Sequence, residues 1–396
     1  MKILVINAGS SSIKFTLFES EDEKQLAKGI VERINTPKAS MRYSNCRGQQ
    51  VSKEVSANSY DAAISEICLA LIDKETGIIK DLLEIKGIGH RVVHGGAEIS
   101  GAVRIDSKVK QVIVDCFSLA PLHNPPNYEG IEACEHLLPQ IPMVAVFDTA
   151  FHQTMKPAAY TYAIPQEVAH KNKIRRYGFH GTSHNYVAVT AASILGREIG
   201  QLKIITAHLG NGCSITAVQH GQVVDTSMGL TPLEGLVMGT RCGDIDPAVV
   251  LFLRRLGFSL DEVDKMLNKA SGLLGVANIG SNDMRDIIRE MEKGSSSAGL
   301  AIDLFVHRLV KYIGAYAAVM NGFDALVFTA GIGENVPLIR SRVCSKLGFL
   351  GVKIDENRNK ARELVISESD TKPAVLVVPT NEELMIARET IRLLNQ

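Results

Sequence analysis

Three short turns rich in glycine, asparagine and serine carry the groups best suited to chemistry on a phosphate. They comprise residues 7–12, 208–214 and 330–335, and each directly follows a predicted strand. Such turns bring backbone N–H groups close to phosphate oxygens, and Lys14 adds a positive charge beside the first. A single turn of this kind is more often selected for its backbone angles than for a ligand. Together the three favour a nucleotide site, although the chain has neither a Walker A sequence nor a complete dinucleotide fingerprint.

Two arginines stand in glycine-containing segments with few other charges, Arg91 within 90–96 and Arg241 within 238–244. A guanidinium group binds carboxylate or phosphate through two parallel hydrogen bonds, which suits a substrate that carries either group. Exposed or salt-bridged arginines are the ordinary alternative. The local sequence does not decide between these two interpretations.

Histidines and carboxylates form the remaining candidates. His180 and His184 are four residues apart, but no cysteine or carboxylate completes a metal site, and one histidine donating to developing negative charge fits better. Asp148 and Glu382 follow strands, whose carboxyl ends gather ligands in open α/β sheets. A hard cation such as Mg²⁺ needs few protein ligands there. Glu382 could instead serve as a helix N-terminal charge. Six histidines are expected in loops or at strand ends: His90, His94, His123, His180, His184 and His208.

The elements that must position these groups alternate between strands and helices, which predicts an α/β fold. Strand, polar turn and strand open the chain and occur again from residue 203, so we expect a duplicated domain, and 396 residues are enough for two. The predicted strands cover 3–6, 13–18, 86–89, 143–147, 203–207, 215–218, 223–225, 325–329 and 374–378. Helices are predicted at 60–72, about 298–320 and about 384–394.

Composition excludes several classes of protein. Lysine plus arginine and aspartate plus glutamate both number 43, so the formal net charge of +0 argues against a protein built for nucleic acid or anionic membranes. Mean hydropathy is +0.08, and no apolar run has the length of a membrane span. The N-terminus lacks the pattern of a signal peptide. Seven scattered cysteines without a CxxC pair predict reduced thiols in a cytoplasmic protein.

A series of motifs in order along the whole chain resembles the acetate/propionate/butyrate kinase family of the sugar kinase–chaperone–actin superfamily. The motifs are NAGSSSIK (7–14), HRVVHGG (90–96), HNPPN (123–127), FDTAFH (147–152), RYGFHGTSH (176–184), HLGNG (208–212), MGTRCGDIDP (238–247), TAGIGEN (329–335) and TNEEL (380–384). We find no departure at a position expected to be catalytic.

The resemblance implies an α/β fold of two duplicated ribonuclease H-like, actin-like ATPase domains with a cleft between them. Residues 1–149 plus about 382–396 would form the N-terminal domain, and 150–381 the nucleotide-binding one. Asp148, His180 and Arg241 are implied to be catalytic, and Asn7 and Glu382 to hold Mg²⁺ or a substituting Mn²⁺. Arg91 is implied to bind the substrate carboxylate, beside an acyl pocket of Val93, Leu122, Phe179 and Pro232. The residues implied for ATP are Lys14, His208, Leu209, Gly210, Asn211, Gly212, Asp283, Met284, Arg285, Gly331, Ile332, Gly333, Glu334 and Asn335.

The reaction implied is reversible, Mg²⁺-dependent transfer of a phosphoryl group from ATP to acetate, giving ADP and acetyl phosphate. A carboxylate with a pKa near ~4–5 is already ionised at neutral pH, so no general base is needed and direct in-line transfer is expected. Asp148 then orients metal-bound water or an arginine. Propionate and butyrate remain alternative substrates, although Val93 should favour acetate. A chaperone-like or filament-forming ATPase is a less favoured alternative. The family further implies a homodimer in the cytoplasm.

Overall fold

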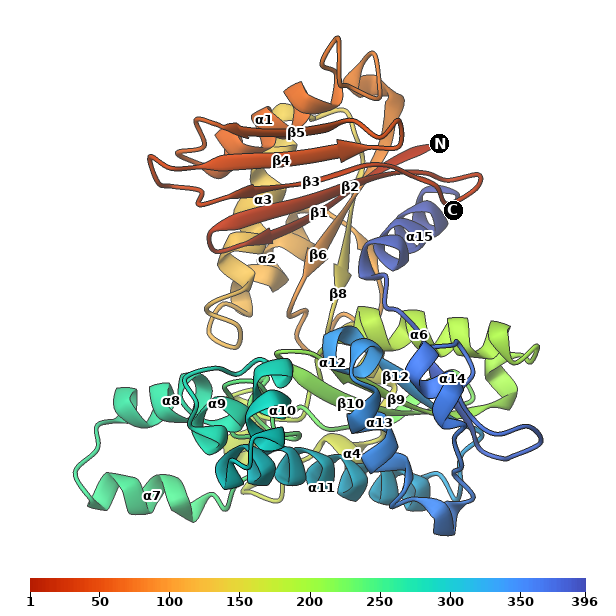
Figure 1. Cartoon of the computed structure of the whole chain (residues 1–396). Coiled ribbons are helices and arrows are strands. Elements are labelled where there is room, and N and C mark those ends of the chain that lie inside the picture. The colour runs from red at the N-terminus through yellow and green to blue at the C-terminus, as the bar shows by residue number, and fades with distance from the viewer. The chain divides into compact units, whose positions relative to one another are not determined.

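The computed structural model describes all 396 residues, which form two compact units. Unit 1 contains Met1–Gln153 together with Asn381–Gln396, and unit 2 contains Thr154–Thr380. Both ends of the chain therefore belong to unit 1 (Figure 1). No helix is both long enough and apolar enough to cross a membrane.

Unit 1 is built on an eight-stranded sheet in the order β5-β4-β3-β2-β1-β6-β8-β7. The central strands β1, β6 and β8 are parallel, whereas β2 to β5 form an antiparallel meander beside β1. The first hairpin pairs Gly9 with Ser12, so only Ser10 and Ser11 form its turn. The strands are β1 (Lys2–Gly9), β2 (Ser12–Glu19), β3 (Gln25–Glu32), β4 (Ser40–Asn45), β5 (Gln50–Glu54), β6 (Ile85–Val92), β7 (Val103–Arg104) and β8 (Met143–Phe147).

Strand β1 contributes to the core on both faces of this sheet. Successive side chains of a strand point to opposite faces, so its continuous apolar run supplies two clusters. Leu4 and Ile6 lie in the cluster that contains α1 and α3, whereas Ile3 and Val5 pack with α15. Figure 1 shows α15, in blue, against β6 and β8. The helices are α1 (Tyr60–Leu71), α2 (Ser107–Asp115), α3 (Asn124–Leu137) and α15 (Glu382–Leu394).

Unit 2 contains a five-stranded sheet in the order β11-β10-β9-β12-β13. Strands β9, β12 and β13 are parallel, β10 pairs antiparallel with β9, and β11 pairs antiparallel with β10. Every residue of β12 is buried, as expected for a central strand with both faces covered. The strands are β9 (Lys203–Leu209), β10 (Cys213–Gln219), β11 (Gln222–Thr226), β12 (Ala325–Thr329) and β13 (Ala374–Val377).

Helix α6 packs on β9 and β12, while the long helix α11 packs on β10 and against α9, α10 and α13. Helices α7 and α8 project from the body of this unit (Figure 1). The helices are α4 (Pro157–Tyr160), α5 (Gln166–Lys171), α6 (Gly181–Ile194), α7 (Ala248–Arg255), α8 (Leu260–Lys269), α9 (Gly272–Ala277), α10 (Met284–Glu292), α11 (Ser296–Val319), α12 (Ala330–Asn335), α13 (Pro337–Cys344) and α14 (Glu356–Ala361). Short 3₁₀ turns cover Leu82–Glu84, Ala150–Thr154, Ile199–Gln201 and Gly348–Leu350.

The two units repeat one sheet topology. The order β3-β2-β1-β6-β8 in unit 1 corresponds strand for strand to β11-β10-β9-β12-β13 in unit 2. In each, the first strand pairs antiparallel with the second and parallel with the fourth. The expected fold class, a duplication of ribonuclease H-like α/β units, is therefore confirmed.

Three predictions about local structure were wrong. Residues 330–335 form helix α12 instead of an open turn, with Ala330 at φ 64° where the chain leaves β12. Strand β6 extends through Val92, so His90 lies inside the sheet between Ile6 and Ala145. His184 lies in the first turn of α6. A histidine gives no strand or helix signal of its own, so its place depends on the neighbouring residues.

Burial of His90 makes the stability of unit 1 sensitive to acid. Its side chain is enclosed and Nε2 has no partner, and burial lowers its pKa from 6.5 to about 3. The neutral ring is favoured in the folded state, so its contribution is complete above pH 6.5 and is lost as the pH falls toward 3. We expect the free energy of unfolding to fall by roughly 1.4 kcal/mol per pH unit within that window because of this residue.

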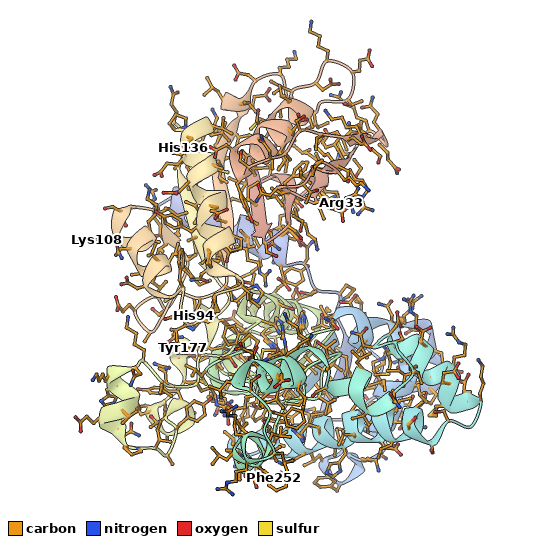
Figure 2. The ribbon with its side chains drawn as sticks, turned by 90° about the vertical axis from the view of Figure 1, so that its left-hand side faces the viewer. Arg33, His94, Lys108, His136, Tyr177 and Phe252 are labelled. Atoms are coloured by element: carbon orange, nitrogen blue, oxygen red, sulfur yellow. The ribbon has the colours of Figure 1, made fainter.

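Urea unfolding followed by circular dichroism at pH 5 and pH 7 measures this slope. His90→Leu should remove it, whereas His136→Leu, at the exposed histidine labelled in Figure 2, should leave it unchanged. An equal pH dependence in the His90→Leu variant and the wild type would contradict the assignment.

Candidate functional site

An ion pair in unit 1 joins two of the predicted residues, half-buried Arg91 and buried Asp148. Arg91 lies on β6 opposite Val146 of β8, and Asp148 follows directly after β8. The Arg91 Nη2 atom donates to Asp148 Oδ2 over 2.6 Å, and Nε donates to the same oxygen over 3.2 Å. The aspartate also raises the pKa of Arg91 further above its usual value. Asp148 thus holds the guanidinium group in a fixed, charged state.

Asn7 and Glu382 complete this group around Arg91. The Nη1 atom of Arg91 donates to Asn7 Oδ1 over 3.4 Å, and its Nε lies 3.8 Å from Glu382 Oε2. Burial raises the pKa of Glu382 to about 7, and Asp148 and Glu383 add to that effect while Arg91 opposes it. Because burial and two neighbouring carboxylates both disfavour the charged form of Glu382, an added cation would stabilise that charged form.

Two asparagines that sequence reasoning left without a role hold the adjoining backbone in place. Asn124 Oδ1 accepts a hydrogen bond from His94 N, and its Nδ2 donates to His94 O. Asn127 Oδ1 accepts from Val93 N, and its Nδ2 donates to Ala8 O over 2.6 Å. Both belong to the motif HNPPN, whose prolines begin α3 and aim its first turn at β1 and β6. The motif itself was therefore the signal that could have identified them.

In unit 2, His180 belongs to a hydrogen-bonded histidine cluster. Its Nδ1 lies 2.8 Å from Ser214 Oγ, and His184 Nε2 lies 2.7 Å from the same hydroxyl. The rings of His180 and His208 stack with their centroids 4.3 Å apart. His180 adopts φ 86° directly before α6. These contacts fix the orientation of the imidazole ring.

Arg241 differs from Arg91 because no carboxylate lies within ion-pair distance of it. Its Nη1 donates to Pro232 O over 3.3 Å, and burial lowers its pKa. A Cβ atom at Gly212 would lie 3.5 Å from both Arg241 Nη1 and His180 Nε2, so both side chains reach the same glycine. A largely buried cation without a counter-ion is suited to a ligand that brings negative charge.

Beside this position lies a cavity of about 660 Å³ formed by three separate segments. A cavity of this volume suits a small organic ligand. Asp283 caps α10 and is paired with the exposed Arg285, which lowers the pKa of Asp283 to about 2. Glu334 stabilises the N-terminal end of α12 by accepting hydrogen bonds from Ala330 N and Thr380 N. The cavity is lined by Gly210, Asn211, Asn282, Asp283, Met284, Arg285, Gly331, Ile332, Asn335 and Val336.

The other predicted residues are distributed as follows. Val93 is buried and Leu122 is 67% exposed, both in unit 1, whereas Phe179 is buried and Pro232 half-buried in unit 2. Lys14 is exposed in a groove of unit 1 beside Thr16, Lys28 and Glu383. His208 and Leu209 end β9, and Gly333 lies buried within α12.

No cluster of three or more histidine, cysteine or acidic side chains is arranged to hold a metal ion by itself. The oxygens of Asn7 and Glu382 are hard donors of the kind that Mg²⁺ binds with phosphate oxygens and water completing its shell. The residues present therefore fit a Mg²⁺ ion that is bound together with a nucleotide.

Comparisons with known proteins agree along the whole chain. A profile of the acetokinase family matches residues 2–388. The acetate kinase of Alkaliphilus metalliredigens is 54% identical over 393 residues, which are 98% of this chain and 99% of that protein. Among solved structures, an acetate kinase from Porphyromonas gingivalis has a TM-score of 0.95 at 44% identity, covering 99% of each chain. A propionate kinase from Francisella tularensis has a TM-score of 0.91 at 46% identity, also covering 99% of each.

Proposed function

We propose that Arg91 and Arg241 bind the two reacting anions, acetate and ATP, in this chain, which belongs to the acetokinase family and is an acetate kinase. The reaction is transfer of the terminal phosphoryl group of ATP to acetate, giving ADP and acetyl phosphate. The observation that carries the proposal is the contrast between the arginines. Arg91 is fixed by carboxylates beside Asn7, whereas Arg241 lies half-buried near His180 without a counter-ion.

On the acceptor side, Arg91 would bind the carboxylate of acetate through its guanidinium group. Asp148 would orient that group, and this role agrees with the hydrogen bonds that it accepts from Nε and Nη2 of Arg91. The residues that the family resemblance implies for the methyl group of acetate are Val93, Leu122, Phe179 and Pro232.

On the donor side, the nucleotide would occupy the cavity lined by parts of 208–212, 283–285 and 331–335. The glycine-containing segments around Gly210 and Gly331 and the exposed Arg285 guanidinium suit an anionic ligand. Lys14 would add charge near the phosphates. Asn7 and Glu382 would hold Mg²⁺, or Mn²⁺ in its place, and the ion supplies neutralisation of charge on the phosphate oxygens.

The transfer itself needs no general base, because acetate is ionised at neutral pH. An oxygen of acetate forms a bond to the terminal phosphorus while the bond from that phosphorus to the bridging oxygen of ADP breaks. Arg241 and His180 would donate to the phosphoryl oxygens as charge redistributes in the transition state. Holding two anions in line for this step is the main contribution of the protein.

Acyl phosphate trapping with hydroxylamine tests the proposal. With ATP and Mg²⁺, we expect acetate to give the highest kcat/KM, followed by propionate and then butyrate, because each methylene changes the pocket fit by about 1–3 kcal/mol. Propionate kinase is the second candidate, favoured by the likeness to the Francisella tularensis enzyme. ATP turnover that does not depend on any carboxylate would contradict both.

We also propose that the protein is a homodimer whose subunits meet at the apolar side chains of α7. Val249, Leu251, Phe252 and Leu256 are between 40% and 61% exposed, and Figure 2 shows Phe252 at the outer boundary of unit 2. Surfaces of clustered exposed apolar residues are typical of protein–protein contacts. A second copy of the chain is the occupant that the family resemblance implies.

The double variant Leu251→Glu, Phe252→Glu should reduce the molar mass in size-exclusion chromatography with light scattering from twice 43.0 kDa to 43.0 kDa. Phe349→Glu, which changes a phenylalanine that is 78% exposed elsewhere in unit 2, is the matched control and should remain dimeric. A monomeric wild type, or a dimer in the double variant, would contradict this interface.

A cytoplasmic location completes the proposal. None of the seven cysteines forms a disulfide bond, and Cys68 and Cys134 are buried. Reduced thiols and an ATP substrate are both typical of that compartment.

A further inference from the structure

The segment that carries Arg241 is a closed loop with a narrow base. Gly235 N donates to Asp244 Oδ1 over 2.8 Å, and Asp244 N donates to Gly235 O over 3.0 Å, so the two ends of residues 235–244 are joined. Gly243 has φ 68°, and a Cβ there would lie 2.4 Å from Leu236 O. The loop therefore closes only with glycine at that position.

Two side chains of α11 hold this base. Arg308 and Tyr312 are four residues apart and lie on one face of the helix. The Nη1 atom of Arg308 donates to Gly235 O over 3.0 Å and to Asp244 O over 3.2 Å, so it bridges both ends of the loop. The Tyr312 hydroxyl donates to Asp244 Oδ2 over 2.9 Å.

The far end of the loop is held mostly through backbone groups, with one side-chain contact in which Thr240 Oγ1 donates to Asn268 O over 2.9 Å. Ser271 N donates to Thr240 O over 3.0 Å, and Cys242 N donates to Leu267 O over 3.0 Å. Substitutions cannot easily remove such backbone contacts. The side chains of Arg308 and Tyr312 at the base are therefore a part of the support for Arg241 that substitutions can change, and the Arg241 guanidinium itself has no carboxylate to fix it.

We infer that Arg308 and Tyr312 are positioning residues, which act with Asp244 as a clamp that sets the place of the Arg241 guanidinium. The inference rests on the charge-stabilising role proposed for Arg241. A rigid helix that holds both ends of a short loop limits its rotation, and small displacements of a charge-stabilising group reduce the rate strongly. None of the clamp residues needs to touch a substrate.

Helix α11 supplies a matched pair of variants. Tyr312→Phe removes a hydroxyl that binds Asp244, whereas Tyr316→Phe removes a buried hydroxyl without a hydrogen-bond partner, one turn farther along. We expect Tyr312→Phe to lower kcat roughly 10- to 100-fold with little change in the KM for ATP or acetate, and Tyr316→Phe to be nearly neutral. Arg308→Lys keeps the charge but loses the bridging fork, and should resemble Tyr312→Phe. Circular dichroism and the melting temperature check the fold of each variant.

A double-mutant cycle tests whether the clamp acts through Arg241. In an Arg241→Lys background, we expect Tyr312→Phe to change kcat less than about 2-fold, because the group to be positioned is already altered. The same loss in both backgrounds, or wild-type kcat in Tyr312→Phe and Arg308→Lys, would overturn the inference. Failure of the proposed function looks different: Arg241→Lys itself would then retain wild-type kcat/KM.

Discussion

Arg241→Ala is expected to lower kcat/KM for acetyl phosphate formation by roughly 10³- to 10⁵-fold, the range typical of arginines that stabilise a transferring phosphoryl group. The side chain is largely buried and its guanidinium contacts only neutral groups, Pro232 O and Met238 Sδ. Alanine there removes positive charge without leaving an acidic partner unpaired. The loss should therefore appear mainly in kcat, with the fold intact.

The control for this variant is Arg197→Ala, which removes an arginine that pairs with Asp324 just before β12. It should keep nearly full activity. Arg241→Lys retains the charge without the planar fork and should be intermediate. Steady-state kinetics with varied ATP and varied acetate separate effects on kcat from effects on KM, and an Arg241→Ala enzyme with normal kcat would refute the proposed role.

Arg91→Ala is the second large effect we expect, again several orders of magnitude in kcat/KM. The physical reason differs, because Arg91 is paired with buried Asp148 and lies 3.8 Å from Glu382. Removing the cation takes away the group proposed to bind acetate and also leaves two carboxylates without compensation. We therefore expect a raised KM for acetate and a lower melting temperature, with a smaller change in the KM for ATP.

The variants Arg91→Lys and Asp148→Asn separate the effect of the positive charge from the effect of its orientation. The lysine keeps a positive charge and should recover stability more than activity, since it cannot donate to Asp148 through two nitrogens. Asp148→Asn should lower turnover by releasing the orientation of Arg91. Near-normal turnover of Asp148→Asn, with unchanged Mg²⁺ dependence, would contradict the positioning role. Arg104→Ala in the same unit, whose guanidinium donates only to Leu393 O, is the control.

Much of the architecture was predictable because local patterns determine it. The apolar runs of β8, β9 and β12 were predicted to within two residues of their observed ends. Helix α1 was predicted at 60–72 and spans Tyr60–Leu71, where Ser59 Oγ caps it by accepting from Ala62 N. The repeated strand, turn and strand pattern indicated the duplication that the two sheets display.

The contacts that hold the candidate site together were not predictable in the same way. Asn127 reaches Ala8 across 119 residues of sequence, and Tyr312 reaches Asp244 across 68. No periodicity links such pairs, since they depend on how whole elements pack. Helix α12 escaped prediction for a related reason: its glycines resemble a turn, and Glu334 stabilises its start by accepting from Ala330 N.

The position of helix α15 in the sequence determines when unit 1 can finish folding during synthesis. Ile386 and Ala387 pack on Ile3, Val5, Val144 and Val146, yet they are separated from those strands by the whole of unit 2. A ribosome releases residues 154–380 before it releases this helix. One face of the first sheet therefore remains uncovered until residues 381–396 leave the exit tunnel. Synthesis of unit 1 therefore begins before that of unit 2 but ends after it.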